Sequence, residues 1–479
     1  MIRMKTSPLF LAVLLSVVAS FKLTAGLAYW DGNDSTTGAG TNPNGIWVGS
    51  AFWSTDPLGE LIAGVWTPGD TAVFSAGSDA LVPFTVTGSG TAGAPGAMAA
   101  GIVVEEGFVT LVGGTVGLGA GPVTIKAGAT LSTDSSLRIS TTAGSVWTLD
   151  GGTARSTNLN SAGSFIDVDS TITLAAGGGT LSHTVAGILN IVQITTIISG
   201  PGSLTKTGAG VLAIASPSTY LGATFVNEGE LRIRTTTNRL PITTAVTVND
   251  PGILNLNSVS QRIGSLAGNG LVGLGNATLT VGDTASTIFS GSIRDIANAG
   301  ASGTTSIRGK VTKVGEGTLT VTGVNTYSGL TQIDSGSIRL GGSERLSDLS
   351  NLRLNGGTFD SVGFNETLGT LDVDASSAID FGSGNSALVF SDSDSQTWDG
   401  LILNIVNWTP GNDTFRVGAD GSGFGAQLAH IQFADFGNAP AQIDANGFIT
   451  PLIIVPEPSS SLLCTFAGIA LLQRSRHRV

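Results

Sequence analysis

Charged side chains are scarce in this chain of 479 residues, in which Asp, Glu, Lys and Arg together make up 12%. An ordinary globular protein has about 25%. Because surface helices rely on Glu, Lys and Arg, this scarcity excludes a helical bundle or a coiled coil. Proline totals only 16 and glycine has no three-residue period, which excludes collagen. The one cysteine, Cys464, can form no internal disulfide, so burial and backbone pairing must stabilise the fold.

Glycine and aliphatic residues are plentiful instead. The chain has 69 glycines, roughly twice the usual share of about 7%, and 41% of its residues are hydrophobic. That hydrophobic content argues against intrinsic disorder. The composition predicts an all-β protein with many short strands and glycine turns, arranged as about two to four domains or one repetitive domain. The formal net charge of −12 argues against nucleic acid as a partner.

Residues 1–28 have the composition of a secretory signal peptide. Arg3 and Lys5 precede an apolar run over 9–19, and small residues follow near Ala28. A transmembrane anchor is the alternative, but the apolar run is shorter than the ~20 residues that a span needs. We therefore expect signal peptidase to cleave after Ala28 or three residues earlier.

The other end of the chain contains three segments in a fixed order. Pro456-Glu457-Pro458 precedes an apolar run over 462–472, and arginines at 474, 476 and 478 follow. An apolar run with basic residues behind it acts as a stop-transfer element. The order resembles the PEP-CTERM sorting signal, which implies processing by an exosortase-like membrane enzyme and transfer to the cell surface or extracellular matrix. A permanent C-terminal membrane anchor is the alternative. The signal residues are Pro456, Glu457, Pro458, Arg474, Arg476 and Arg478.

Two segments of the chain match each other without a gap. Residues 206–233 (KTGAGVLAIASPSTYLGATFVNEGELRI) align with residues 313–340 (KVGEGTLTVTGVNTYSGLTQIDSGSIRL). A match at a fixed offset indicates a repeat architecture. The paired residues that define the motif are Lys206 and Lys313, Gly208 and Gly315, Gly210 and Gly317, Tyr220 and Tyr327, and Gly222 and Gly329.

Each repeat alternates apolar and polar residues over three short strands. In the second copy the alternation predicts that the aliphatic residues point inward and that the Thr and Arg residues point outward. Each glycine is expected to supply the positive φ of a tight corner. Short strands joined by glycine corners suit one coil of a β-solenoid, whose core forms only when coils stack. The inward residues are expected to be Leu319, Val321, Ile333, Ile338 and Leu340.

This unit resembles the autotransporter-associated β-strand repeat, also called the passenger-associated transport repeat. The second copy carries the family's Lys-x-Gly-x-Gly-x-Leu opening and its Asn-Thr-Tyr-x-Gly-x-Thr centre, whereas the first copy has Ser218 where the second has Asn325. Weaker relatives of the unit occupy 245–266 and 352–371. The resemblance implies a right-handed parallel β-helix.

Composition shifts along the chain predict its domain organisation. Four of the seven tryptophans lie within 29–100, where they could plug the open end of a solenoid or, alternatively, form a carbohydrate-binding platform. A short helix is expected at 427–433. The predicted parts are a signal peptide (1–28), a Trp-rich N-terminal cap (29–100), a β-solenoid (101–400), a C-terminal cap (401–452) and a sorting tail with a C-terminal helix (453–479).

The sequence contains few candidate catalytic or metal-binding residues. Parallel β-helices also host polysaccharide lyases and hydrolases, and a hydrolase needs two carboxylates a few ångströms apart. Acids spaced by two would share one face of a strand. The histidines have no metal-ligand spacing, and the oxygen-rich segments 31–34 and 392–394 match no calcium loop, which leaves calcium open. The candidates are Asp167 with Asp169, Asp372 with Asp374, Asp392 with Asp394, His183, His430, Lys310 and Lys313.

Together these patterns predict a secreted, non-enzymatic structural or adhesive β-solenoid, sorted to the cell surface or extracellular polymer matrix and needing no cofactor. The expected partners are signal peptidase and an exosortase-like enzyme, and an extracellular polysaccharide is a further candidate. The alternatives are a β-helix polysaccharide lyase or hydrolase, and a carbohydrate-binding surface protein.

Overall fold

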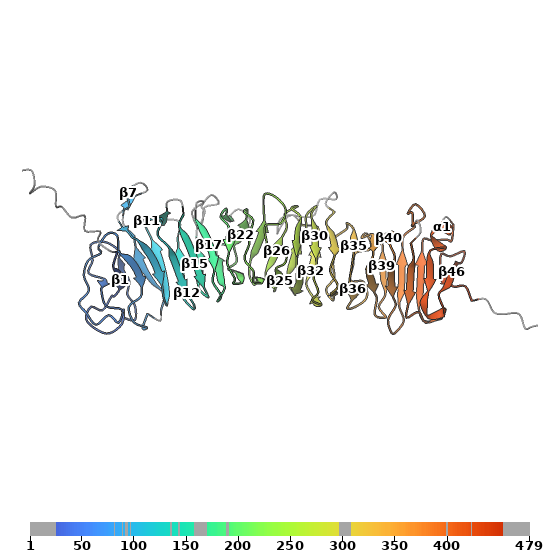
Figure 1. Cartoon of the computed structure of the whole chain (residues 1–479), viewed down its shortest axis with the longest axis horizontal. Coiled ribbons are helices and arrows are strands. Elements are labelled where there is room, and N and C mark those ends of the chain that lie inside the picture. The colour runs from blue at the N-terminus through green and yellow to red at the C-terminus, as the bar shows by residue number, and fades with distance from the viewer. Residues whose placement is uncertain are drawn as a thin grey trace, which may run out of the picture. The chain divides into compact units, whose positions relative to one another are not determined.

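The computed structural model describes residues 25–453 apart from 81, 89, 92–93, 96, 135–136, 142–143, 158–169, 188–190, 297–307, 399–400 and 423. Most of the predicted signal peptide and the whole Pro-Glu-Pro and arginine signal of the sorting tail lie outside these residues, as do Asp167 and Asp169. The chain forms two compact units, residues 1–222 and 223–479. Both units are stacks of short parallel strands, so the predicted all-β parallel solenoid is confirmed (Figure 1).

Unit 1 stacks its strands into separate faces, and nearly all of its strand pairs are parallel. The exceptions are the antiparallel pairs β1–β3 and β6–β7. One face contains β1 (Leu27–Trp30), β3 (Trp53–Ser54), β4 (Thr71–Phe74), β9 (Gly101–Val104), β12 (Val123–Lys126), β15 (Val146–Asp150), β17 (Thr171–Leu174) and β20 (Ile198–Ser199). The next contains β2 (Gly45–Ile46), β5 (Phe84–Thr87), β10 (Phe108–Val112), β13 (Thr130–Thr133), β16 (Thr153–Ser156), β18 (Gly179–His183) and β21 (Leu204–Thr207). The remaining strands are β6 (Gly90–Thr91), β7 (Ala94–Pro95), β8 (Ala97–Met98), β11 (Gly114–Gly119), β14 (Leu137–Thr141), β19 (Ile191–Ile194) and β22 (Val211–Ile214).

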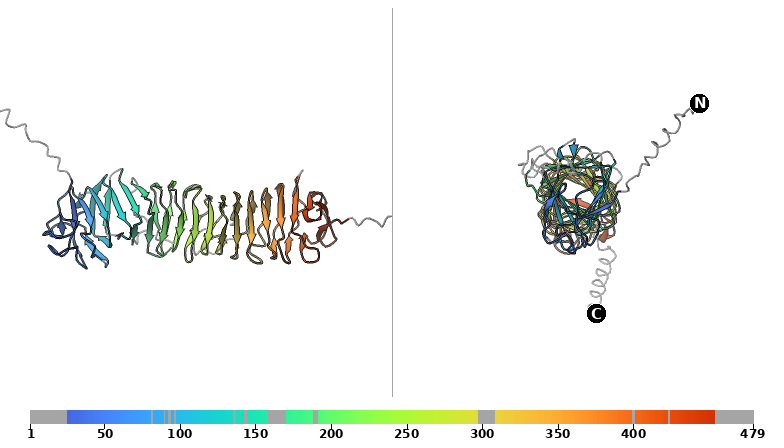
Figure 2. Two further views of the ribbon diagram at one scale, coloured as in Figure 1. Left: turned by 60° about the horizontal axis from the view of Figure 1, so that its bottom comes forward. Right: turned by 90° about the vertical axis from the view of Figure 1, so that its left-hand side faces the viewer.

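Unit 2 repeats this arrangement, and its coils follow one another in sequence order (Figure 2). One face contains β23 (Thr224–Val226), β25 (Ala245–Val248), β28 (Ser265–Gly268), β31 (Thr287–Phe289), β34 (Thr318–Val321), β36 (Ser337–Leu340), β38 (Thr358–Asp360), β41 (Ser377–Asp380), β43 (Leu403–Val406) and β45 (Ile431–Phe433). A second contains β24 (Glu230–Ile233), β26 (Ile253–Asn255), β29 (Leu271–Gly273) and β32 (Ser292–Arg294). A third contains β27 (Gln261–Ile263), β30 (Thr278–Val281), β33 (Lys310–Lys313), β35 (Thr331–Ile333), β37 (Leu352–Asn355) and β40 (Leu371–Ala375). A shorter sheet contains β39 (Glu366–Leu368), β42 (Ala387–Phe390) and β44 (Thr414–Val417).

The stack of unit 2 ends in antiparallel strands. The strand β46 (Ala439–Ile443) pairs antiparallel with β45 and with β47 (Ile449–Pro451). Near this end lie the helix α1 (Gly425–Leu428) and the 3-10 turn η2 (Ala434–Phe436). The helix predicted at 427–433 is therefore wrong beyond Leu428, because residues 431–433 alternate buried and half-buried side chains and join the sheet as β45. Among the described residues, no helix is long and apolar enough to cross a membrane.

Equivalent apolar residues form rows through successive coils. In unit 1, one row contains Ile102, Val123, Trp147, Ile172 and Ile198, all at most 1% exposed. The residues predicted to point inward in the second repeat are all at most 2% exposed, so this prediction is confirmed. Burial of these rows is the main favourable contribution to folding, since the chain has no disulfide.

The repeat glycines fall into two physical classes. Gly208 and Gly315 have φ of +76° and +69°, the left-handed region in which a side chain is strained. Gly210 and Gly317 lie outside this region, as do Gly222 and Gly329, so positive φ is the wrong explanation for these four. Glycine is needed at these four positions because neighbouring coils approach so closely that a side chain would not fit. A Cβ on Gly317 would lie 2.0 Å from the carbonyl oxygen of Ala285, and one on Gly329 would lie 2.2 Å from that of Gly309.

We predict that Gly317→Ala lowers the stability of unit 2 by about 1–3 kcal/mol, because the new methyl group overpacks the contact with the preceding coil. The matched control is Gly425→Ala, where a Cβ would meet nothing within 4 Å. Thermal unfolding followed by circular dichroism measures both effects. Equal midpoints for the two variants would contradict the close-approach explanation.

Candidate functional site

The two repeat lysines occupy inward positions in the strand that opens each repeat. Lys206 lies beside Leu181 of the preceding coil, and Lys313 lies in a row between Val281 and Ile333. The lysines are 0% and 2% exposed. An ammonium group removed from water needs hydrogen-bond acceptors to offset its lost hydration.

Backbone carbonyl groups at the coil corner supply those acceptors. The Nζ of Lys313 donates to the oxygens of Val314 at 2.7 Å, Gly315 at 2.8 Å and Ser335 at 3.4 Å. Lys206 makes the equivalent bonds to the two residues that follow it, at 2.8 and 2.6 Å. Burial lowers the pKa of the Lys313 ammonium. The Lys-x-Gly spacing therefore closes a corner: the glycine turns the backbone, and the lysine binds the carbonyl groups that the turn exposes.

The alternation of apolar and polar residues predicts that the repeat lysine points inward. If the alternation of the second repeat is extended backward, Val311 points inward, Thr312 outward and Lys313 inward, which is the observed burial pattern. The repeat motif alone contains Lys313 but does not give the direction of its side chain. Lys310, the other lysine considered for catalysis, is exposed at the start of the same strand.

A chain of hydroxyl groups stabilises the centre of the second repeat. Tyr327 is 1% exposed, and its Oη lies 2.6 Å from the Thr331 Oγ1. Thr331 lies 2.7 Å from the Ser350 Oγ, which donates to the carbonyl oxygen of Gly329 at 2.7 Å. Burial raises the pKa of Tyr327 above its usual range, so its hydroxyl stays protonated. The prediction that Thr residues point outward is wrong for Thr331, which is fully buried because these hydroxyl groups satisfy it.

Asn325 links three consecutive coils of unit 2. Its Oδ1 accepts the backbone N–H of Ile293 at 2.8 Å, and its Nδ2 donates to the carbonyl oxygen of Arg345 at 2.9 Å. The first repeat has Ser218 at this position, 7% exposed, with an Oγ that has no hydrogen-bond partner. The shorter side chain therefore does not make the equivalent link in the first repeat.

A buried carboxyl group lies near the second repeat and was not found from the sequence. Glu366 is 1% exposed, and its two oxygens accept the backbone N–H groups of Arg345 at 2.8 Å and Leu346 at 3.0 Å. Burial raises its pKa to about 8, although both hydrogen bonds act in the opposite direction. Its position at the start of β39 carries no local sequence signal, because the short strand offers little alternation.

Two of the three candidate acid pairs lie among the described residues, and both are held in ordinary structural contacts. Arg353 Nε lies 3.1 Å from Asp372 and 3.5 Å from Asp374, so both members of this pair share one cation. Burial raises the pKa of Asp372, and the Asp374 charge adds to the increase, while Arg353 opposes it. Asp392 and Asp394 are exposed in a turn, where the backbone N–H of Asp394 donates to Asp392 at 3.2 Å.

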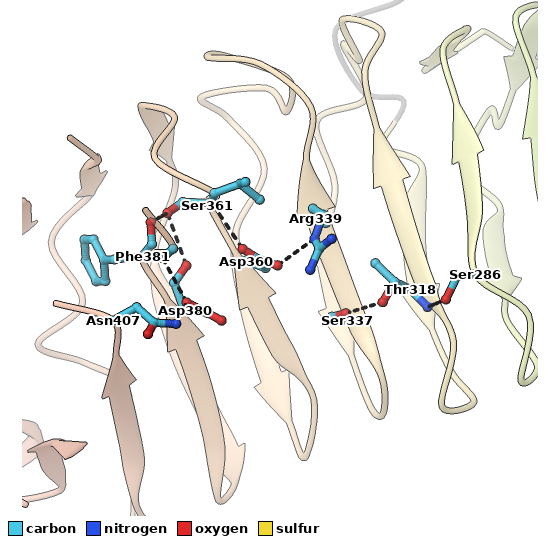
Figure 3. A network of polar contacts seen from close by, with 11 residues as sticks. Ser286, Thr318, Ser337, Arg339, Asp360, Ser361, Asp380, Phe381 and Asn407 are labelled. Atoms are coloured by element: carbon cyan, nitrogen blue, oxygen red, sulfur yellow. Dashed lines mark hydrogen bonds and ion pairs between the residues drawn. The ribbon is translucent and has the colours of Figure 1, made fainter. Parts of the chain in front are cut away.

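Polar side chains on the neighbouring face interact from coil to coil (Figure 3). Arg339 Nε lies 2.7 Å from the Asp360 Oδ2, and Asn407 donates to the Asp380 Oδ1 at 2.7 Å. Ser361 donates to the backbone carbonyl oxygens at 380 and 381, at 3.2 and 3.1 Å. These contacts connect successive strands and bring no catalytic pair of free carboxylates together.

The two histidines among the described residues lie in separate units, and each contacts a backbone carbonyl group. His183 Nδ1 is 3.2 Å from the oxygen of Ser156, and His430 Nδ1 is 2.8 Å from that of Leu401. Over the described part of the chain, no group of three or more His, Cys, Asp and Glu side chains is arranged to hold a metal ion.

The four N-terminal tryptophans form one buried cluster. Trp30, Trp47, Trp53 and Trp66 are at most 5% exposed. Trp53 lies 4.9 Å from Trp30 and 4.6 Å from Trp66 between ring centroids. Buried indole rings cannot stack on a sugar, so the carbohydrate-binding platform is wrong for these residues. They contribute a large buried apolar cluster with favourable edge and tilted ring contacts.

A family model of the passenger-associated transport repeat matches residues 204–233 and 311–340. The chain carries two passenger-associated transport repeats. The resemblance inferred from the sequence is therefore confirmed, and each match begins just before the buried lysine, at the inward residues Leu204 and Val311. No curated protein and no solved structure matched the chain in the same comparisons. The PEP-CTERM signal stays a prediction.

We predict that Lys313→Met destabilises unit 2 by roughly 3 kcal/mol, because Met fills the aliphatic space and leaves buried carbonyl groups without a donor. Lys310→Met is the matched control, since it removes the same charge from the exposed end of the same strand. Chemical unfolding of both variants tests the difference. If the two variants lose stability equally, the corner hydrogen bonds are not what Lys313 contributes.

We predict that the stability of unit 2 falls as pH rises from about 4.5 to about 8, because folded Glu366 retains its proton over this range and the unfolded chain does not. Each pH unit costs roughly 1.4 kcal/mol for one such group. Glu366→Gln removes this contribution to the pH dependence, although it also disturbs one backbone hydrogen bond. The measurement is the urea midpoint between pH 5 and pH 8.5, and identical slopes in wild type and variant would refute the assignment.

Proposed function

We propose that the protein is an exported, non-enzymatic β-solenoid that lies at the cell surface or in the extracellular matrix, where it acts in adhesion or matrix packing. The observation that carries the proposal is the burial of the repeat's own motif. Lys206, Lys313, Tyr220 and Tyr327 are at most 2% exposed. Side chains used to close and fill coils cannot contact a substrate, so the motif builds a scaffold whose regular outer face remains for binding.

Export is supported by the repeats, which are associated with the passengers of autotransporter-type proteins, and by the predicted addresses at the two ends. In this proposal signal peptidase removes residues 1–28, and an exosortase-like enzyme recognises Pro456-Glu457-Pro458 while the basic tail holds the chain in the membrane. The acidic charge of −12 favours partners other than nucleic acid. An extracellular polysaccharide is the candidate partner, and contact would occur on polar outer strands.

A polysaccharide hydrolase is the second candidate, and one observation favours it. Asp372 is 8% exposed with a raised pKa, and the more exposed Asp374 follows on the same strand. A pair of carboxyl groups on one face of a strand, with one of them shielded from water, is the kind of arrangement that glycosidases use. Arg353 contacts both carboxyl groups, however, and such a cation favours two ionised acids over a shared proton.

We predict that protease added to intact producing cells degrades the wild-type protein, because the mature chain is displayed outside. Glu457→Ala should leave full-length, unprocessed protein in the membrane fraction, since the recognition element is altered. Immunoblots of the fractions measure both outcomes, and Glu228→Ala is the control substitution of an acid outside the sorting tail. Protection of the wild-type protein in intact cells would contradict surface display.

The purified protein should also release no unsaturated or reducing ends from a panel of acidic polysaccharides. Release that disappears in Asp372→Ala, while the variant keeps its unfolding midpoint, would replace the structural proposal with the hydrolase.

A further inference from the structure

Positive charge is concentrated in one stretch of this acidic chain. The whole chain has 22 Lys and Arg against 34 Asp and Glu, whereas residues 231–310 contain seven of the former and only three of the latter. One of the seven, Arg232, is buried and paired with Glu230. None of the ion pairs within the described residues involves the other six. This part of unit 2 therefore carries a local positive potential although the chain as a whole is negative.

Two of the unpaired cations lie close together on the outer face of one sheet. Arg262 in β27 and Lys310 in β33 are both exposed, and the residues beside them along each strand are buried. The strand β30 lies between them, with Thr280 beside Arg262 and Thr278 beside Lys310. The two cations are therefore two strand spacings apart, about 10 Å across the sheet.

Two further arginines lie beside the same strands. Arg308 is exposed two residues before Lys310, and its backbone N–H donates to Asn276 Oδ1 at 2.9 Å. Arg239 is half-buried in the coil before β27, where its backbone N–H donates to Gln261 Oε1 at 2.9 Å. Four cations therefore surround the beginning of this sheet.

An acid beside these cations is bound to the backbone. One oxygen of Asp295 accepts the N–H of Gly309 at 2.7 Å, and the other accepts the N–H of Ser328 at 2.8 Å and its hydroxyl group at 2.7 Å. Asp295 thus holds two coils together and forms no ion pair with Arg308.

A polar row continues from Arg262 across the following strands. The register places Thr280 beside Thr312 and Thr312 beside Gln332, and all three side chains are half-buried. The hydroxyl groups of Thr280 and Thr312 make no hydrogen bond to another described residue, so they remain available to a ligand. We call Arg262, Arg308, Lys310, Thr280 and Thr312 together the basic face.

We propose that the basic face binds an acidic extracellular polysaccharide. Carboxylates of the sugars pair with Arg262, Arg308 and Lys310, and sugar hydroxyl groups bond to the two threonines between them. The inference rests on the proposed function, in which a polysaccharide is the candidate partner, and it names the chemical class of that partner and the face that binds it.

The shape and charge of the basic face favour this ligand over other anions. Its polar groups repeat at the strand spacing of about 4.8 Å, which is close to the length of one sugar unit in an extended chain. Nucleic acid is a much denser polyanion, and the acidic remainder of the chain repels it. A few cations with hydroxyl groups between them suit a chain whose sugars carry a single carboxylate each.

Electrophoresis of the purified protein through native gels that contain a polysaccharide tests the inference. Polygalacturonate is the acidic probe, dextran is the neutral comparison, and a chelator excludes bridging by divalent cations. Polygalacturonate should retard the wild-type protein, and salt should weaken the effect because exposed charges are screened. Arg262→Gln combined with Lys310→Gln should raise the apparent Kd about tenfold, since each exposed ion pair contributes roughly threefold.

A second double variant separates the basic face from net charge. Lys126→Gln combined with Arg339→Gln removes the same charge from cations that already pair with acids, and should bind as wild type does. If the Arg262 and Lys310 variant has a lower unfolding midpoint, Lys310→Gln alone decides, with an expected loss of about threefold.

Three results would overturn the inference: no retardation of wild type, equal retardation by dextran, or equal weakening in the two double variants. Self-association of the wild type that disappears in the Arg262 and Lys310 variant, without polysaccharide binding, would assign the face to a second copy of the chain instead. Surface display without binding refutes this inference alone. Binding by a protein that stays protected inside intact cells refutes the proposed function.

Discussion

Parallel coils must lie a fixed distance apart, because backbone hydrogen bonds hold neighbouring strands about 4.8 Å from each other. The corners of each coil have to meet the same spacing, although they contain turns and exposed carbonyl groups. Glycine meets this requirement at Gly210 and Gly317, where a Cβ would come within 2.2 and 2.0 Å of the preceding coil. The exposed carbonyl groups of the corner also need hydrogen-bond donors. Lysine supplies them, because an ammonium group inside the corner binds carbonyl groups that water cannot reach.

The close stacking of coils also determines where the remaining inward polar side chains find hydrogen-bond partners. The inside of the coils is shielded from water, so a polar side chain that points inward must find a partner inside its own coil or in the next one. Tyr327, Thr331 and Ser350 do so through one another, and Asn325 does so through backbone groups. The chemistry of the repeat is therefore structural. Binding is left to the outer face and to the ends of the stacks.

Much of this arrangement could be predicted from the sequence. Alternation identified the inward residues, and the repeat identified coils, because both depend only on local order. Alternation also predicts the inward direction of Lys313. The outward assignment of Thr residues is wrong at Thr331, because alternation with Ile333 places Thr331 inward, where hydroxyl groups of residues 327 and 350 satisfy it. The burial of Glu366 could not be predicted, because its partners lie in the preceding coil. The role of Gly317 could not be predicted either, since it is set by Ala285, far away in sequence.

Hydrogen–deuterium exchange of the unmodified protein tests the central claim, that the glycine-rich corners are fixed structural elements and not flexible links. The N–H groups of Gly210 and Gly317 donate to carbonyl oxygens of the preceding coil at 2.8 and 2.9 Å. Peptides that span 208–210 and 315–317 should therefore exchange as slowly as the strands β21 and β33 beside them. Exchange of the corners at the rate of free peptide, with the strands still protected, would contradict the account.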